Sequence, residues 1–401
     1  MGFGSGFSWS TIQVKLPIQG RYIDSQQGPL ELVMGSTLLI GSCEPFSGKS
    51  ALVLGLARQL SAAGHAVRFG KPLATSLDWS GVSGPLPDPL IDDDVRFVGT
   101  TLGLDESQLI PSLHLLEPGT ASGRLASGSL DAGAGFERLR EQLRADDGTV
   151  TLLEAAGSLH EGLLYGLSLG QLARGLDASV VLVHLWQDSR SVEALLAARD
   201  QLGERLAGVV LNAVTPDDVE ALQQRVVPEL EALGLSVFGV MPRSPLLRSV
   251  TVGELVRRLD ARVICCEERL ELLVETLSIG AMNVNSAMEF FRHRRNMAVV
   301  TGADRTDIQL AALEASTQCL ILTGAGEPLP QLISRADELE VPLLKVERDT
   351  LATVEVIEQA FGHVRLHEAV KATYAFRLVE EHCQLDRLFA ALGLALSLIH
   401  I

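Results

Sequence analysis

The stretch Gly41-Ser-Cys-Glu-Pro-Phe-Ser-Gly-Lys-Ser50 decides the fold of this chain. It follows an apolar run at residues 37–40 and leads into a helical pattern that extends from Ala51 to about Ala63. A strand, a glycine-bearing turn, Gly-Lys-Ser and a helix form the arrangement in which backbone N–H groups hold phosphate oxygens. In such a loop, Lys49 is expected to neutralise the outer phosphates and the Ser50 hydroxyl to ligate magnesium. The stretch therefore predicts a binding site for a nucleoside triphosphate.

The loop departs from the usual phosphate-binding pattern in one respect. That pattern has a glycine five positions before the glycine of Gly-Lys-Ser, where this chain has Cys43, and Gly41 comes two residues too early. The alternative interpretation is an ordinary strand-to-helix turn whose Lys49 lies in solvent. The loop residues predicted to contact the nucleotide are Glu44, Ser47, Gly48, Lys49, Ser50 and Ala51.

The composition fits a large, acidic, cytoplasmic protein. Of 401 residues, 47% are apolar and 21% charged, and the length predicts two domains. Lys and Arg number 33 against 50 Asp and Glu, which gives a net charge of −17. This charge argues against a nucleic-acid partner, because binding to a phosphodiester backbone needs clustered cationic side chains. The five cysteines lack metal-ligand spacing and fit reduced thiols. No apolar segment is long enough for a bilayer, so no membrane partner is expected.

Short β-branched runs alternate with amphipathic helical patterns, which is typical of a parallel sheet covered on both faces. The first series of predicted strands is 36–40, 66–69, 150–153, 179–184, 208–211 and 237–240. The break Pro242-Arg-Ser-Pro245 separates it from a second α/β series, with strands predicted at 262–265, 297–300, 318–322 and 343–346. The sequence thus predicts an α/β fold with a P-loop domain at 34–245 and a smaller domain at 246–362. Residues 1–33 are expected to be a disordered extension and residues 363–401 a helical one.

Carboxylates at predicted strand and helix ends are candidates for the same site. Magnesium needs oxygen ligands that the loop does not supply. Glu154 ends a predicted strand, and the carboxyl ends of parallel strands face the crevice where ligands bind. Asp92, Asp93 and Asp94 precede a predicted helix, where metal binding and helix capping explain them equally well.

Two further polar side chains follow predicted strands. Lys71 comes after the strand at 66–69, where it would face the terminal phosphate or an acidic substrate, or simply lie in solvent. Asn212 ends the strand at 208–211, where its side-chain amide is able to read a purine base.

In their order along the chain these residues resemble dethiobiotin synthetase-like P-loop proteins. The resemblance implies that Ser50, Glu154 and Asp94 or one of its neighbours Asp92 and Asp93 hold magnesium, that Lys49 and Lys71 act on the phosphoryl group of ATP, and that Asn212 lies at the base. Members of that family have a glycine-rich loop after the strand-end glutamate, where Ala155-Ala156 stand here. Their loop before the Gly-Lys pair is also one residue shorter. Both differences lie beside the substrate site and argue against carboxylation chemistry.

The second half resembles a DRTGG domain. Asp304-Arg305-Thr306 match the name-giving motif, whereas Asp307 and Ile308 replace its two glycines. The motif lies between a predicted strand and a predicted helix at 309–315, so Arg305 is able to pair with an anion and Asp304 or Asp307 to cap the helix. The resemblance implies nucleotide sensing at Asp304, Arg305 and Thr306, or a homodimer through this domain.

Together the two domains are similar to the N-terminal regulatory half of long phosphate acetyltransferases and to phosphotransacetylase-like proteins without the acetyltransferase domain. The resemblance implies a link to acetyl phosphate and acetyl-CoA metabolism, with no acetyltransferase active site in this chain. It favours a regulatory protein that binds ATP with Mg²⁺, hydrolyses it slowly or not at all, and signals to a partner protein or a second subunit. The alternatives are an ATP-dependent ligase acting on a small carboxylate or amine, and a non-catalytic scaffold.

Overall fold

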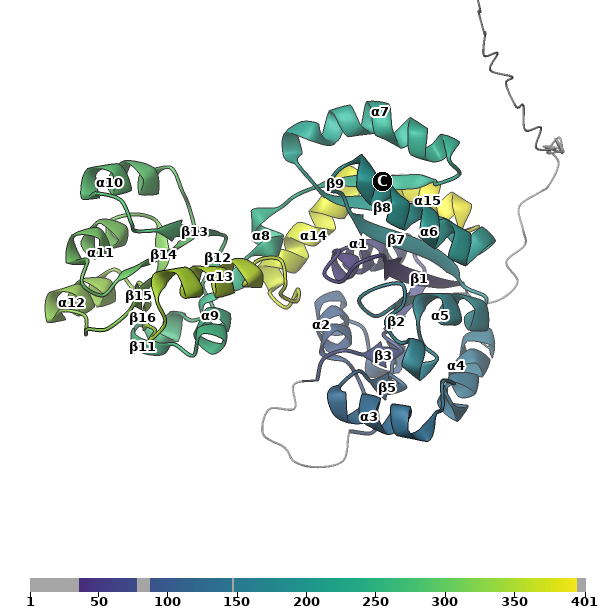
Figure 1. Ribbon diagram of the computed structural model, residues 1–401. Helices are drawn as coiled ribbons and strands as arrows, with labels where there is room; N and C mark the ends of the chain where they lie inside the picture. The colour runs from purple at the N-terminus through teal and green to yellow at the C-terminus, as the bar shows by residue number, and fades with distance from the viewer. Residues whose placement is uncertain (1–35, 78–86, 146–147, 395–401) are drawn as a thin grey trace, which may run out of the picture.

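The computed structural model describes residues 36–77, 87–145 and 148–394, which form two α/β units joined side by side (Figure 1). The first unit is built on a seven-stranded sheet in the order β4-β2-β6-β1-β7-β8-β9, whose neighbouring strands are all parallel. The strands are β1 (Thr37–Ser42), β2 (Ala66–Gly70), β4 (Leu109–Ile110), β6 (Thr149–Glu154), β7 (Ser179–Leu185), β8 (Leu206–Val214) and β9 (Val237–Pro242).

Helices cover both faces of this sheet because apolar side chains point alternately to its two sides. Leu38 and Ile40 of β1 belong to the core under α1 (Lys49–Ala62) and α2 (Asp93–Leu102). Leu39 belongs to the opposite core. The helices on that side are α4 (Ala134–Ala145), α5 (Leu169–Leu176), α6 (Val192–Leu202) and α7 (Val219–Ala232). A short parallel pair, β3 (Leu73–Ala74) and β5 (His114–Leu115), and helix α3 (Pro118–Ser127) lie at the edge of the unit.

The last helices return to the first unit. In Figure 1, α14 (Ala369–His382) and α15 (Leu385–Ala391), in yellow, run beside α1 and β9. Apolar residues of both helices, among them Leu378, Val379 and Phe389, are buried in the same core as α1. A Cβ atom at Gly55 would lie 2.4 Å from Val379 Cβ, so the absence of a side chain allows α1 and α14 to approach closely. The chain therefore leaves the first unit after β9 and re-enters it at α14.

The second unit has a five-stranded sheet in the order β11-β16-β15-β14-β13, parallel except for β11 (Arg262–Cys265) against β16 (Leu343–Lys345). Its other strands are β13 (Thr276–Ile279), β14 (Met297–Gly302) and β15 (Thr317–Thr323). Helices α9 (Val252–Leu259) and α13 (Thr350–Ala360) cover one face, and α10 (Val284–Arg292), α11 (Thr306–Leu313) and α12 (Pro330–Glu338) the other. Helix α8 (Pro245–Arg248) and the pair β10 (Val250–Thr251) and β12 (Leu273–Val274) lie where the units join.

The α/β fold with a parallel P-loop sheet and a smaller second α/β unit is confirmed. The predicted strand series lack the edge strands β4 and β13, and the starts of two helices were wrong. Helix α1 begins at Lys49 rather than Ala51, and α11 begins at Thr306 rather than Gln309. No side chain caps α11, because its preceding residue, Arg305, has no side-chain oxygen to accept from the first-turn amides. The predicted extension at 1–33 and the apolar run at 395–401 lie outside the described residues.

Among residues 36–77, 87–145 and 148–394, none of the helices combines the length and the apolar composition that crossing a bilayer requires.

Candidate functional site

The loop between β1 and α1 has a backbone that requires glycine next to the lysine. Gly48 has φ of 99°, in the left-handed region. A Cβ atom at Gly48 would also lie 2.3 Å from Asn212 Nδ2. That amide donates a 2.7 Å hydrogen bond to the Ser47 carbonyl oxygen, so the side chain at the end of β8 holds the loop in place. The Ala51 N–H is bonded to the Gly48 carbonyl oxygen within the first helical turn.

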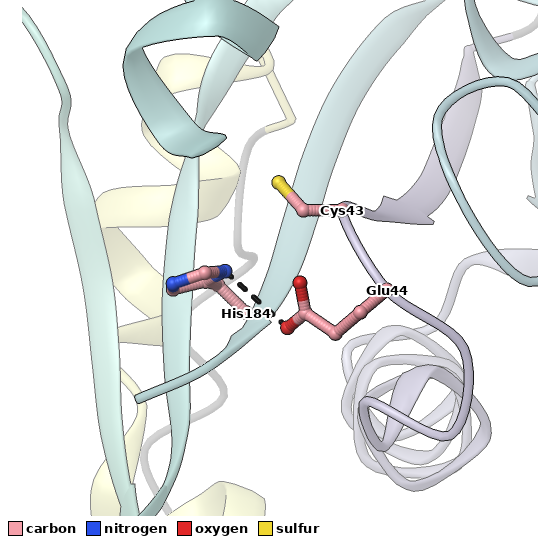
Figure 2. A group of neighbouring side chains, drawn as sticks. All are labelled: Cys43, Glu44 and His184. Carbon is pink, nitrogen blue, oxygen red and sulfur yellow. Dashed lines mark ion pairs between the residues drawn. The ribbon is translucent and has the colours of Figure 1, made fainter. Parts of the chain in front are cut away.

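Glu44 fixes the start of the loop to β7, as Figure 2 shows. Its Oε1 accepts a 2.5 Å hydrogen bond from the Leu185 N–H and lies 3.3 Å from His184 Nδ1. Burial raises the pKa of the neighbouring Cys43 thiol to about 12, with Glu44 contributing, so this thiol stays protonated at neutral pH. Glu44 is not among the described residues that line the adjacent cavity. Its predicted contact with a nucleotide has no geometric support here.

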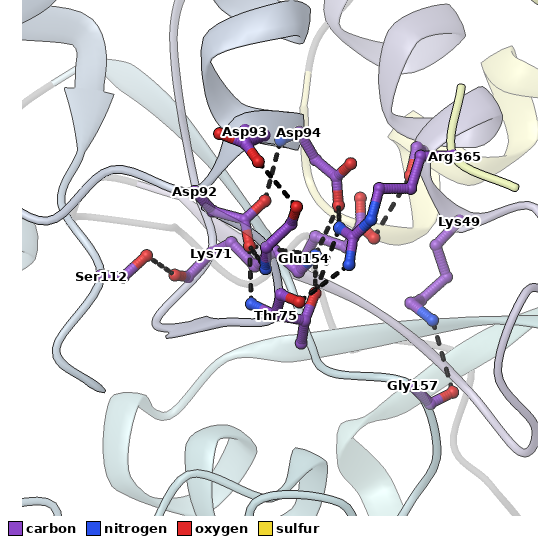
Figure 3. A network of polar contacts seen from close by, with 12 residues as sticks. Lys49, Lys71, Thr75, Asp92, Asp93, Asp94, Ser112, Glu154, Gly157 and Arg365 are labelled. Atoms are coloured by element: carbon purple, nitrogen blue, oxygen red, sulfur yellow. Dashed lines mark hydrogen bonds and ion pairs between the residues drawn. The ribbon is translucent and has the colours of Figure 1, made fainter. Parts of the chain in front are cut away.

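The remaining loop residues face a cavity of about 670 Å³ at the carboxyl edge of the sheet. Ser50 Oγ donates to Glu154 Oε1 across 3.3 Å, as expected for two ligands of one ion. Lys49 Nζ donates to Ser42 Oγ at 3.0 Å. It also donates to the Gly157 carbonyl oxygen at 3.4 Å (Figure 3). Burial lowers the pKa of Lys49, with Glu154 opposing that effect. The lysine is folded back on the loop in a position from which it reaches the cavity.

The three consecutive aspartates have three different roles. Asp92 caps α2, because its Oδ1 accepts from the Asp94 N–H at 2.8 Å and its Oδ2 accepts from the Thr75 and Ser76 N–H groups. Asp93 accepts from Ser76 Oγ at 2.6 Å. Only Asp94 is among the residues that line the cavity. The capping and metal-binding interpretations therefore apply to different members of the run.

Asp94 is paired with Lys71, which is buried and not solvated. Lys71 Nζ lies 2.6 Å from Asp94 Oδ2 and 3.5 Å from Asp92 Oδ2, and it donates to Thr75 Oγ1 at 2.7 Å. Burial disfavours the charged form of Lys71, but Glu154, Asp94 and Asp92 outweigh burial and raise its pKa. Lys71 is thus a charged lysine with carboxylate partners beside the phosphate loop.

Two side chains that sequence patterns did not identify, Arg365 and His367, complete the site. Arg365 Nη1 lies 2.9 Å from Asp94 Oδ2, and His367 Nε2 lies 2.9 Å from Asp94 Oδ1. Arg365 Nη2 also donates to the Thr75 carbonyl oxygen at 2.8 Å. Burial alone would raise the pKa of Asp94, but His367, Lys71 and Arg365 outweigh it and lower that pKa well below the ordinary value. The segment after α13 has no phosphate-binding motif, so no local signal marks these residues.

The oxygen atoms gathered here fit a magnesium ion. Ser50, Glu154 and Asp94 offer a hydroxyl and two carboxylates, the hard ligands that Mg²⁺ prefers. Glu154 is 4% exposed, and its Oε2 has no hydrogen-bond partner within the described residues. Burial raises the pKa of Glu154, although Lys71 and Lys49 oppose this. A buried carboxylate oxygen without a partner is costly, and a cation would satisfy it.

The residues of the second predicted ligand site lie elsewhere. Asp304, Arg305 and Thr306 follow β14 in the second unit, and none of them lines the cavity described above. Arg305 Nη2 donates to the Met282 carbonyl oxygen at 3.0 Å, and its Nε lies 3.4 Å from Asp307 Oδ1. The motif arginine is thus bonded within its own unit.

Known proteins resemble both units. Residues 36–251 match the family model described as an AAA domain, and residues 254–360 match the DRTGG domain. The phosphate acetyltransferase of Nitratidesulfovibrio vulgaris is 23% identical over 372 residues, which cover 87% of this chain and 50% of that protein. The phosphate acetyltransferase of Deinococcus radiodurans is 27% identical over 343 residues, which cover 79% of this chain and 45% of that protein. The chain spans about half the length of the curated relatives it matches.

Among solved structures, the CBS and DRTGG domains of the regulatory region of Clostridium perfringens pyrophosphatase, complexed with the activator diadenosine tetraphosphate, are similar to 37% of this chain. The match covers 72% of that structure at 17% identity and a TM-score of 0.26, a likeness too distant to carry an argument about fold or ligand.

Proposed function

Because the chain belongs to the AAA domain family, in its dethiobiotin synthetase-like form, and also carries a DRTGG domain, we propose that it is a regulatory protein that binds ATP with magnesium. The resemblance inferred from the sequence, including that to phosphate acetyltransferases, is confirmed. ATP binding, the regulatory role, a cytoplasmic location and the link to acetyl phosphate and acetyl-CoA metabolism are parts of the proposal.

One observation carries the proposal. Ser50 Oγ and Glu154 Oε1 lie 3.3 Å apart at the start of α1, with Lys49 and Lys71 beside them on one cavity. In phosphoryl chemistry a lysine and a magnesium ion neutralise the outer phosphates, and a loop serine and a strand-end acid hold the metal. Magnesium, when bound, would supply charge neutralisation at the β- and γ-phosphates. The residues of this chain orient the phosphates through the loop and exclude water from Glu154.

The proposal further includes a homodimer through the DRTGG domain and transmission of the nucleotide state to a protein partner. Support comes from apolar side chains that the second unit leaves exposed, among them Ile279, Phe290 and Leu310. A regulatory role fits slow hydrolysis or none. Turnover that depends on a small carboxylate or amine would instead favour the ligase alternative.

Calorimetric titration of the full chain with ATP and magnesium tests the proposal. We expect ATP to bind with a dissociation constant in the micromolar range. Binding should be lost in Lys49→Ala, because the cationic partner of the phosphates is then absent. In Glu154→Gln, we expect binding that no longer depends on magnesium. The exposed Arg138→Ala on α4 is the matched control and should bind as the wild type does. Absence of binding by a folded wild-type chain would leave only the scaffold alternative.

A further inference from the structure

The segment between the two units runs through the nucleotide site. It begins after α13 of the second unit and ends at α14, which packs on α1, and its residues 361–366 line the cavity. The segment is attached on both sides. The Gly362 N–H donates to the Arg248 carbonyl oxygen at 3.1 Å, and Lys371 pairs with Glu368 at 2.9 Å and donates to the Ser249 carbonyl oxygen. A movement of α13 in the second unit would therefore be transmitted along the chain to the residues that line the cavity.

Two side chains of this segment, Arg365 and His367, reach Asp94. Asp94 Oδ2 receives both Arg365 and Lys71 (Figure 3). His367 Nε2 lies at Oδ1, so three hydrogen-bonding groups share one carboxylate. If Asp94 gave an oxygen to a magnesium ion, one of these groups would have to give up its contact with that oxygen. Lys71 is 4% exposed and has other carboxylates nearby, whereas the Arg365 side chain is 33% exposed and belongs to an irregular segment. The His367 side chain is 35% exposed and belongs to the same segment, but only Arg365 has the guanidinium that matches a phosphate, so Arg365 is the group that we expect to move.

We propose that Arg365 binds the terminal phosphate of the nucleotide when magnesium takes Asp94, so that the site distinguishes ATP from ADP and reports the difference to the DRTGG domain. The inference rests on the proposed function. A planar guanidinium matches phosphate oxygens with two parallel hydrogen bonds, which makes arginine well suited to a transferable contact of this kind. In phosphoryl-transfer sites an arginine on the terminal phosphate is a recurrent element.

Coupling to the second unit follows from chain connectivity. Arg365 lies five residues after Ala360, the last residue of α13. His363, between them, contacts the Phe46 ring of the phosphate loop edge-on, with ring centroids 5.2 Å apart. A shift of Arg365 from Asp94 to a phosphate would therefore pull on α13 and on the loop together. The second unit would receive the nucleotide state through this segment.

The test compares two nucleotides in the full-length chain. Dissociation constants for a non-hydrolysable ATP analogue and for ADP, each with magnesium, are measured by calorimetry for wild type, Arg365→Gln and Arg365→Lys. We expect Arg365→Gln to weaken the ATP analogue roughly ten- to a hundredfold, the value of a hydrogen-bonded charge, and to leave ADP unchanged. Arg365→Lys should weaken binding of the ATP analogue less than Arg365→Gln does, because lysine keeps the positive charge although it lacks the paired donors of the guanidinium. Arg377→Ala, an exposed arginine on α14, is the matched control.

Two results would overturn the inference. Equal weakening of both nucleotides would mean that Arg365 only supports the structure, and tighter ATP binding in Arg365→Gln would mean that it merely competes with magnesium for Asp94. Thermal unfolding of each variant shows whether it is folded. If Arg365→Gln does not fold, Arg365→Lys still allows the comparison of the two nucleotides. If the wild type binds neither nucleotide, the proposed function itself fails, and that is visible before any variant is made.

Discussion

Asp94 shows at the scale of a single residue how the site is held before a ligand arrives. Its carboxylate is the common partner of Lys71, Arg365 and His367, and its pKa is lowered because these groups outweigh burial. A group whose pKa is lower in the folded state stabilises the fold above its ordinary pKa, about 3.9, and that contribution is lost as pH falls toward the folded-state value. Part of the stability at neutral pH should therefore depend on this one ionised side chain.

The first prediction concerns Asp94→Asn. Removing one partner of a buried ion pair leaves an uncompensated charge on Lys71, so we expect the free energy of unfolding at pH 7 to fall by about 3 kcal/mol, the lower part of the usual range because Asp92 remains nearby. The loss should shrink as pH drops below about 4, because Asp94 then binds a proton in the unfolded state while it stays ionised in the folded state. Urea unfolding between pH 7 and pH 3 measures both effects.

Asp188→Asn is the control for this experiment. Asp188 also has a lowered pKa, about 2, from its hydrogen bonds to Arg190, but that pair lies at the surface. Solvent screens exposed ion pairs, so the substitution should not move the unfolding midpoint. If Asp94→Asn behaves in the same way as this control, the buried pair contributes nothing and the lowered pKa of Asp94 is not realised in solution.

At the scale of elements, the packing of α14 on α1 joins the segment after the second unit to the helix that follows the P-loop. Gly55 lies in α1, where alanine would favour the helix by about 1 kcal/mol. A methyl group there would meet the Val379 side chain at 2.4 Å, and overpacking a tight interface typically costs about 1–3 kcal/mol. We predict that Gly55→Ala destabilises the chain and that adding Val379→Ala recovers part of the loss. A double-mutant cycle in urea measures the coupling.

The matched control is another glycine in a helix. Gly123 of α3 is exposed, and a Cβ atom there would meet nothing within 4 Å. Gly123→Ala should therefore stabilise the chain by about 0.5–1 kcal/mol through helix formation alone. Simple additivity of the Gly55 and Val379 substitutions would show that the two helices do not touch in solution.

How much of this element-level structure the sequence predicts depends on the separation of the contacting residues. The strand, loop and helix around Lys49 are consecutive, so a pattern of about 25 residues is enough to identify them. Glu154 was identifiable because strand ends in parallel sheets share an edge. Arg365 is separated from Asp94 by 271 residues, and no local spacing connects them. The packing of α14 against α1 was missed for the same reason, since an amphipathic helix does not indicate which surface it covers.

At the scale of the whole molecule, the second unit is connected to the first twice, after β9 and again before α14. This double connection explains why the cavity contains residues from both sides of the second unit in the sequence, such as Arg243 and Arg365. A unit connected at both ends cannot move without shifting the segment that lines the cavity. Self-association of the second unit would thus act on the segment that lines the cavity.

The last prediction concerns that self-association. On the second unit, Phe290 of α10 and Leu310 of α11 are 36% and 40% exposed, and these two helices pack against each other. Burying such side chains between two chains is favourable, whereas a lysine in the interface would leave an unpaired charge there. We expect light scattering to give the mass of two chains for the wild type and of one chain for Leu310→Lys. Leu125→Lys, at a 76% exposed position of α3 in the first unit, should remain a dimer. A wild type that is monomeric at every concentration tested, or equal dissociation by both substitutions, would contradict a dimer built through this domain.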